Sequence, residues 1–220
     1  MCKLHKELQN SLAWLLSVIG AGGSGKTSTA LWIIENWFPE DNVAIYKYHP
    51  EVLKAFPEHI RKRTISFEHM GEIAGKPYII LLDDTALHFL SRSTSGSDNK
   101  DLVRQLTIAR HNDQRIISTA QNSILIDKGV YESLDQYSLR CRMTDLQALT
   151  EREEVVQLQL RINEMLQAAG ERLPANKRKG LRYCPETGEI LYFPAVPWMN
   201  DTISKPYKGY YVRSGELTSV

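Results

Sequence analysis

A short stretch near the N-terminus has the residue types and spacing of a phosphate-binding loop. Residues 20–27 have the sequence GAGGSGKT, which is the Walker A pattern of a glycine, four residues and Gly-Lys-Thr. Glycines let backbone N–H groups surround phosphate oxygens, and the helix that follows adds partial positive charge. Lys26 would reach the β- and γ-phosphates, and the Thr27 hydroxyl would ligate Mg²⁺. We therefore expect ATP and Mg²⁺ as ligands, with these nucleotide-binding residues: Gly20, Ala21, Gly22, Gly23, Ser24, Gly25, Lys26, Thr27 and Ser28.

The residues on both sides of this stretch fit the same interpretation. Residues 14–19 are an apolar run of strand length, and residues 29–38 have a helical pattern that Pro39 ends. A phosphate loop needs a strand before it and a helix after it. The alternative, an ordinary glycine-rich turn, does not require these flanks.

Two adjacent acids supply a second candidate site. Asp83 and Asp84 follow residues 78–82, an apolar run typical of a strand buried on both faces of a parallel sheet. Ligands gather at the carboxyl ends of such strands, so this is a Walker B pattern. Asp83 would hold Mg²⁺ through water, and Asp84 would polarise the attacking water. The alternative is a simple turn at the end of the strand.

A third polar position follows the next predicted strand, residues 115–120. Gln121 comes directly after it, where a polar side chain can sense the γ-phosphate and orient water. An ordinary turn residue is the alternative at this position.

The composition indicates one main hydrophobic core. The chain has 220 residues, of which 42% are hydrophobic, and a net charge of +1, so binding of nucleic acid would depend on local basic patches. The three cysteines are scattered and lack metal-ligand spacing, which favours a reduced, cytoplasmic setting. The apolar run before the loop is too short to span a membrane, and we interpret it as a strand rather than a signal peptide.

The order of the remaining patterns predicts an α/β fold with a mostly parallel central sheet flanked by helices. One strand is expected between the two Walker strands. We expect a P-loop ATPase domain over residues 1–170 and a C-terminal basic segment with a β-hairpin appendage over residues 171–220. The other expected elements are strands at 43–48, 64–67 and 137–142, helices at 2–10, 100–111 and from Thr144 or Thr150 to 170, a polar loop at 91–99 and a hairpin at 183–193.

Two segments carry a more specific resemblance. IILLDD, and then TIARHNDQRIISTAQNSILID, resemble the FtsK/HerA superfamily of P-loop ATPases, especially its viral genome-packaging (poxvirus-type) branch and the related Zot-like proteins. In those families an Arg-His pair closes a helix, a short strand follows, and Thr-x-Gln ends it. Here these positions are Arg110-His111, residues 116–118 and Thr119 to Gln121. The resemblance covers about residues 12–145 and implies the strand order of RecA- and FtsK-like proteins.

The resemblance implies a homo-oligomeric ring that hydrolyses ATP to move double-stranded DNA without sequence specificity, in packaging motors together with capsid or portal proteins. It also implies an arginine that acts on the nucleotide of the neighbouring subunit. Arg110 is the first candidate, followed by Arg104, Arg115 and Arg140. Two departures are visible: the second Walker B acid is Asp84 rather than glutamate, and the membrane segment usual in Zot-like proteins is not seen.

DNA contacts would fall on phosphates, because a translocating motor tolerates any sequence. Two basic clusters are candidates, Arg61 to Arg63 and Arg172 to Arg182, although either can be a solvated surface.

Other functions fit less well. A helicase loader of the AAA type would need a helical lid with a sensor arginine; the helix expected after the last strand has Arg152 and Arg161 but lacks a Gly-Ala-Arg-like element. A nucleotide kinase would need an arginine-rich lid, and residues 91–99 hold a single arginine. A nucleotide-binding switch without hydrolysis does not explain Asp84.

Overall fold

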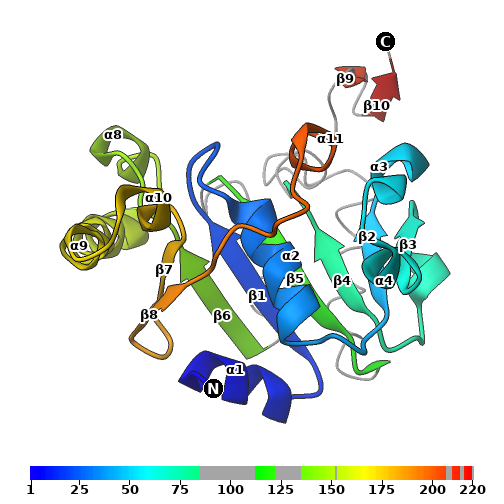
Figure 1. The fold of residues 1–220 in the computed structure, drawn as a ribbon, viewed down its shortest axis with the longest axis horizontal. Helices are drawn as coiled ribbons and strands as arrows, with labels where there is room; N and C mark the ends of the chain where they lie inside the picture. The colour runs from blue at the N-terminus through cyan, green and yellow to red at the C-terminus, as the bar shows by residue number, and fades with distance from the viewer. Residues whose placement is uncertain (85–111, 122–134, 152, 207–209, 214–215, 220) are drawn as a thin grey trace.

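A parallel sheet extended by an antiparallel hairpin organises the chain (Figure 1). The computed structural model describes residues 1–84, 112–121, 135–151, 153–206, 210–213 and 216–219. The strand order is β3-β2-β4-β5-β1-β6-β7-β8, in which the pairs from β3 to β6 are parallel. The strands are β1 Trp14–Ile19, β2 Val43–Tyr46, β3 Thr64–Phe67, β4 Ile79–Leu82, β5 Arg115–Ala120, β6 Asp135–Arg140, β7 Leu181–Cys184 and β8 Glu189–Tyr192. Because β5 lies between β4 and β1, the predicted α/β fold and strand order are confirmed.

Apolar side chains fill both faces of this sheet. Along β1, Trp14 and Leu16 belong to the core cluster that includes α1 and α2, whereas Leu15 belongs to a second cluster on the opposite face. All six residues of β1 are buried. Strands that are covered on both faces have continuous apolar sequences, as the runs in β1 and β4 predict.

Helix α2 begins at the end of the phosphate loop and crosses one face of the sheet (Figure 1). The described helices are α1 Lys3–Asn10, α2 Lys26–Asn36, α3 Pro50–Lys54, α4 Glu58–Arg61, the 3-10 helix η1 Met70–Ile73, α8 Asp145–Ala148, α9 Glu153–Glu171, α10 Ala175–Arg178 and α11 Asp201–Ser204. None of these helices combines the length and apolar character that crossing a membrane requires.

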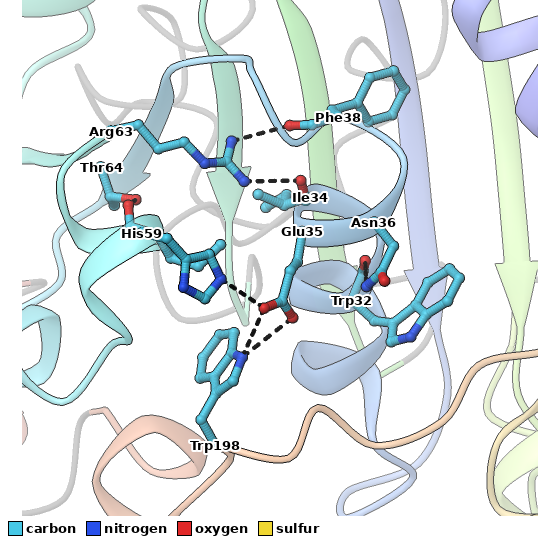
Figure 2. A network of polar contacts seen from close by, with 10 residues as sticks. Trp32, Ile34, Glu35, Asn36, Phe38, His59, Arg63, Thr64 and Trp198 are labelled. Carbon is cyan, nitrogen blue, oxygen red and sulfur yellow. Dashed lines mark hydrogen bonds and ion pairs between the residues drawn. The ribbon is translucent and has the colours of Figure 1, made fainter.

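The C-terminal segment returns to the phosphate-loop half of the molecule. The hairpin of β7 and β8 joins the main sheet through antiparallel pairing with β6. The chain then crosses in front of α2 before α11 (Figure 1). There the Trp198 indole donates to the Glu35 carboxylate at 3.2 Å, and His59 lies 2.8 Å from the same carboxylate (Figure 2). A separate two-stranded sheet follows, formed by β9 Tyr210–Arg213 and β10 Glu216–Ser219.

Several element boundaries differ from those that the sequence predicts. Strand β2 ends at Tyr46 rather than residue 48, because Lys47 adopts a left-handed backbone with φ of 53°. The predicted strand at 137–142 is β6, which begins and ends two residues earlier. The long helix is divided, since α8 has its own capping box from Thr144 and Gln147 before α9 begins.

The apolar stripe that the sequence predicts along α9, consisting of Val155, Leu158, Ile162, Met165 and Ala169, is confirmed at Ile162 but is wrong at Leu158. The sequence pattern predicts a stripe that includes Leu158 and Ile162, but Leu158 is 40% exposed while Gln159 and Asn163 are buried beside Ile162. These two amides are inside because they satisfy polar groups at and just after the end of β6: Gln159 bonds to Arg140 and the backbone oxygen of Cys141, and Asn163 accepts from the N–H of Met143. The predicted loop at 91–99 and the predicted helix at 100–111 lie outside the described residues.

Candidate nucleotide-binding site

The phosphate loop occupies the six residues between β1 and α2. Gly25 precedes the helix with φ of 84°, a left-handed conformation that glycine adopts without strain. Gly20 lies against the end of β6, where an added Cβ would be 2.4 Å from the Cβ of Cys141. Both glycines are therefore required by backbone conformation or by close packing, which is why the loop takes this shape.

Lys26 folds over this loop. Its Nζ donates to the backbone oxygen of Ala21 at 3.0 Å. Burial lowers the pKa of Lys26, and the nearby charges of Asp84 and Asp83 oppose that effect. The ammonium group is thus held among the residues where phosphates are expected.

Asp83, at the end of β4, is hydrogen-bonded to side chains from three other segments of the chain. Its carboxylate is 2% exposed and accepts hydrogen bonds from three hydroxyls. Thr27 at the start of α2 donates at 2.9 Å, Tyr48 after β2 at 2.5 Å and Thr119 in β5 at 2.7 Å. The Thr27 hydroxyl and the Asp83 carboxylate are oxygen donors of the kind that Mg²⁺ prefers, so these two side chains fit the expected metal.

Asp84 lies beside this carboxylate in an uncommon backbone conformation. Its φ is 47°, and its N–H donates to Thr119 Oγ1 at 2.8 Å. Burial raises the pKa of Asp84, the charge of Asp83 adds to the increase, and Lys26 counteracts it. The Thr119 hydroxyl therefore holds both acids: it donates its proton to the Asp83 carboxylate and accepts the backbone N–H of Asp84.

One cavity of about 570 Å³ brings the predicted residues together. Its lining includes Lys26, Thr27, Asp83, Asp84 and Gln121. The C-terminal segment closes part of it with Ala195, Met199, Ser204, Lys205 and Pro206. Arg110 lies outside the described residues, so its placement stays a prediction.

A second cavity of about 430 Å³ lies on the other side of the loop tip. Gly22 and Gly23 line both cavities. The remaining lining comes from Ala21 and Ser24 of the loop, residues 141–144 after β6, Gln147 of α8, the last turns of α9 and the segment around β7, which includes Arg182. The two spaces therefore meet across the phosphate loop.

Tyr48 and Thr119 donate hydrogen bonds to Asp83, and the sequence analysis did not predict this role for either residue. Each stands at or just beyond the carboxyl end of a strand next to β4. That position was the available signal, because side chains at neighbouring strand ends converge in parallel sheets.

Two of the further arginine candidates are held by contacts within the chain. Arg140 is 6% exposed, donates to Gln159 at 3.2 Å and lies 3.9 Å from the Glu151 carboxylate. Arg115 begins β5, at the opposite end of that strand from Gln121, and pairs with Asp41 at 3.0 Å. Neither arrangement fits an arginine that extends toward a neighbouring subunit. Arg104, like Arg110, lies outside the described residues.

Each predicted DNA-binding cluster contains an arginine that is used internally. Arg63 donates to the backbone oxygens of Ile34, Phe38 and Asp41, the first two at 3.0 Å, and so caps the end of α2 (Figure 2). Arg182, in the other cluster, is 2% exposed and lies behind the phosphate loop. These two guanidinium groups therefore have internal hydrogen-bond partners, unlike a freely solvated basic cluster.

No protein-family model matches the sequence, and no characterised protein matches it at a significant level. Several solved structures are similar. The genome packaging NTPase B204 from Sulfolobus turreted icosahedral virus 2, in complex with ATP-gammaS, is 12% identical with a TM-score of 0.45, covering 83% of this chain and 97% of that one. B204, the DNA-packaging ATPase from Sulfolobus turreted icosahedral virus, is 14% identical with a TM-score of 0.47, over 83% and 97%. The N-terminal domain of zonular occludens toxin from Neisseria meningitidis is 19% identical with a TM-score of 0.42, over 61% and 79%.

The class of protein is defined by the chain itself. A Walker A loop joins the central strand β1 to α2, and the acids that follow β4 reach the same cavity across the intervening strand β5. This is a P-loop NTPase fold with an additional strand between the Walker strands.

Proposed function

We propose that this chain is an ATPase that acts as a homo-oligomeric ring and translocates double-stranded DNA, in the manner of a viral genome-packaging motor. The observation that carries the ATPase part is the hydrogen bond of 2.9 Å between Thr27 and Asp83, with Lys26 and Asp84 lining the same cavity. This arrangement unites a phosphate-binding loop, two oxygen ligands for a metal and a second acid.

Each side chain has a distinct proposed role. Lys26 binds the β- and γ-phosphates, Thr27 and Asp83 hold Mg²⁺, and the metal when bound neutralises charge on the phosphate oxygens. Asp84 accepts the proton of the attacking water as general base, and Gln121 orients that water.

The two cavities suggest how ATP lies on the loop. The triphosphate occupies the cavity that contains Lys26 and Asp83, and the nucleoside occupies the cavity of about 430 Å³ beside α9. A ligand that uses both spaces crosses Gly22 and Gly23, where no side chain obstructs it.

The motor part of the proposal rests on the resemblance of residues 79–84 and 107–127 to the packaging branch of the FtsK/HerA superfamily. Arg110 would act on the nucleotide of the adjacent subunit. DNA phosphates would contact the basic side chains that remain exposed, such as Arg61 and Arg172. Capsid or portal proteins would be the partners, in the host cytoplasm or in the virion.

The ATPase part is tested by phosphate release from ATP. Lys26→Ala should abolish hydrolysis, and Asp84→Asn should retain ATP without turnover. Lys54→Ala, which removes an exposed lysine paired with Glu51 on α3, is the control and should hydrolyse ATP normally. Normal hydrolysis by Asp84→Asn would show that another group is the base.

The motor part needs a separate assay. The ATPase rate is measured with and without double-stranded DNA, and the mass of the assembly is measured with a non-hydrolysable ATP analogue. We expect DNA to increase the rate and the analogue to favour the ring. A monomer whose ATPase rate is the same with and without DNA would contradict the motor. Mixing Arg110→Ala with Lys26→Ala subunits should restore part of the activity if Arg110 acts across the interface.

A further inference from the structure

We propose that Arg182 is a positioning residue for the phosphate loop, which it holds from the C-terminal hairpin in the conformation that binds phosphate. The inference rests on the proposed function in one respect, namely that the loop binds the triphosphate of ATP. It assigns a role to a strand of the C-terminal segment in that binding.

The contacts of Arg182 link three parts of the fold. From β7, its Nη2 donates to the backbone oxygen of Ser24 in the loop at 2.8 Å, and its Nε donates to Thr29 Oγ1 on α2 at 3.2 Å. Its Nη1 donates to the backbone oxygens of Lys179 and Leu181 at 2.7 and 2.8 Å. The guanidinium group is therefore fixed in orientation by its own strand and is shared between the loop and the first turns of the helix.

The bond to Ser24 sets the direction of one backbone N–H. In a trans peptide the C=O and the N–H point in opposite directions, so a carbonyl held toward Arg182 turns the N–H of Gly25 to the other side. Gly25 lines the cavity that contains Lys26 and Asp83. Arg182 thus directs a hydrogen-bond donor of the loop away from itself and into the space proposed for phosphate.

The charge of Arg182 supports the same role. Among the residues that the structure describes, no carboxylate is paired with it, and its partners are three carbonyl oxygens and one hydroxyl. A buried cation with neutral partners gains when an anion binds nearby. Lys26 Nζ donates to the backbone oxygen of Ala21, and Arg182 donates to that of Ser24, so both cations lie against the same loop. Phosphate bound in the loop would supply negative charge to both.

Close packing leaves little freedom at this contact. A Cβ added at Gly25 would lie 3.3 Å from Arg182 Nη2. The guanidinium group therefore fits against a loop residue whose left-handed backbone already requires glycine.

The test compares Arg182→Met and Arg182→Lys with Arg161→Met, a matched removal of an exposed arginine from α9. The probes are inorganic tripolyphosphate and ATP, whose dissociation constants are measured by titration calorimetry. We expect Arg182→Met to weaken both at least tenfold, because it loses the charge and the bond to Ser24. Arg182→Lys should weaken them less, since it keeps the charge, and Arg161→Met should bind as the wild type does.

A merely structural role would give a different result. It would lower the unfolding temperature of the unliganded Arg182 variants and leave the tripolyphosphate affinity of the folded protein unchanged, which would overturn the inference. If Arg182→Met does not fold, an Arg182→Lys variant with wild-type affinity for both probes would overturn it equally. If the wild type itself binds neither ATP nor tripolyphosphate, it is the proposed function that fails.

Discussion

Replacing Thr119 by valine should show how strongly hydrogen bonding holds the two acids of the site. The Thr119 hydroxyl is buried, donates to Asp83 at 2.7 Å and accepts from the N–H of Asp84 at 2.8 Å. Valine has nearly the same shape, so the substitution removes both bonds without opening a cavity. A hydrogen bond to a charged group contributes about 1.5–3 kcal/mol, and an unpaired buried donor costs about 1–3 kcal/mol.

The expected loss in the free energy of unfolding lies near the lower end of the sum of these two contributions. Asp83 keeps the hydroxyls of Thr27 and Tyr48, which can move closer to its carboxylate. We therefore expect the free energy of unfolding to fall by about 3 kcal/mol. For a chain of this length, that loss lowers the unfolding temperature by roughly 6–12 °C.

The assay is urea unfolding followed by tryptophan fluorescence, with Thr119→Ser as the control. Serine keeps the hydroxyl and should lose much less stability. In the same variants, Thr119→Val should raise the Mg²⁺ concentration needed for half-maximal ATP hydrolysis, because Asp83 is then held less firmly. Equal unfolding midpoints for the wild type and Thr119→Val would refute the view that this hydroxyl fixes the acids.

Three further predictions concern stability and reactivity. Arg63→Met should lower the free energy of unfolding by about 2 kcal/mol in urea titrations, because backbone oxygens around the end of α2 lose their donor. The control Arg61→Met should change it by less than about 0.5 kcal/mol. Burial lowers the pKa of His5 from 6.5, so the unfolded chain takes up this proton at a higher pH than the folded chain does. The free energy of unfolding should therefore fall as the pH drops below about 6.5. His5→Gln should reduce that fall, measured as the difference in unfolding free energy between pH 7.5 and pH 5. Burial raises the pKa of Cys184 to about 11, so at pH 8 only about 0.1% is thiolate and mass spectrometry should find the native thiol resistant to iodoacetamide under conditions that modify it in urea.

The loop between β1 and α2 could be predicted from the sequence because the signals are local. The glycines, Lys26 and Thr27 are consecutive or nearly so, and the strand and helix beside them follow from short apolar patterns. The convergence of Asp83 on Thr27 also follows, since both stand at the carboxyl edge of one parallel sheet. The hydroxyls that complete the site were not predictable in the same way. Tyrosine and threonine are common near strand ends, and nothing local distinguishes one that reaches a carboxylate.

The buried face of α9 illustrates a second limit. Helical periodicity assigns apolar residues to the core, but Gln159 and Asn163 are the buried side chains next to Ile162. Gln159 accepts from Arg140 and donates to the backbone oxygen of Cys141, and Asn163 accepts from the N–H of Met143. Polar groups at the end of β6 therefore rotate the helix, and a pattern confined to the helix does not contain that information.

The two arginines that donate to backbone oxygens, Arg63 and Arg182, bear on how this chain would contact DNA. A guanidinium group carries five N–H donors in a plane, so several backbone carbonyl oxygens can satisfy it inside the fold, and a basic run in the sequence does not by itself mark a surface. Arg63 holds the end of α2 and Arg182 holds its beginning, which means that one arginine from each predicted cluster stabilises the helix of the phosphate loop. Substituting a whole cluster would then impair nucleotide binding and stability together. Loss of DNA binding is therefore attributable to surface charge only when the exposed members, such as Arg61 and Arg172, are changed and these two arginines are kept.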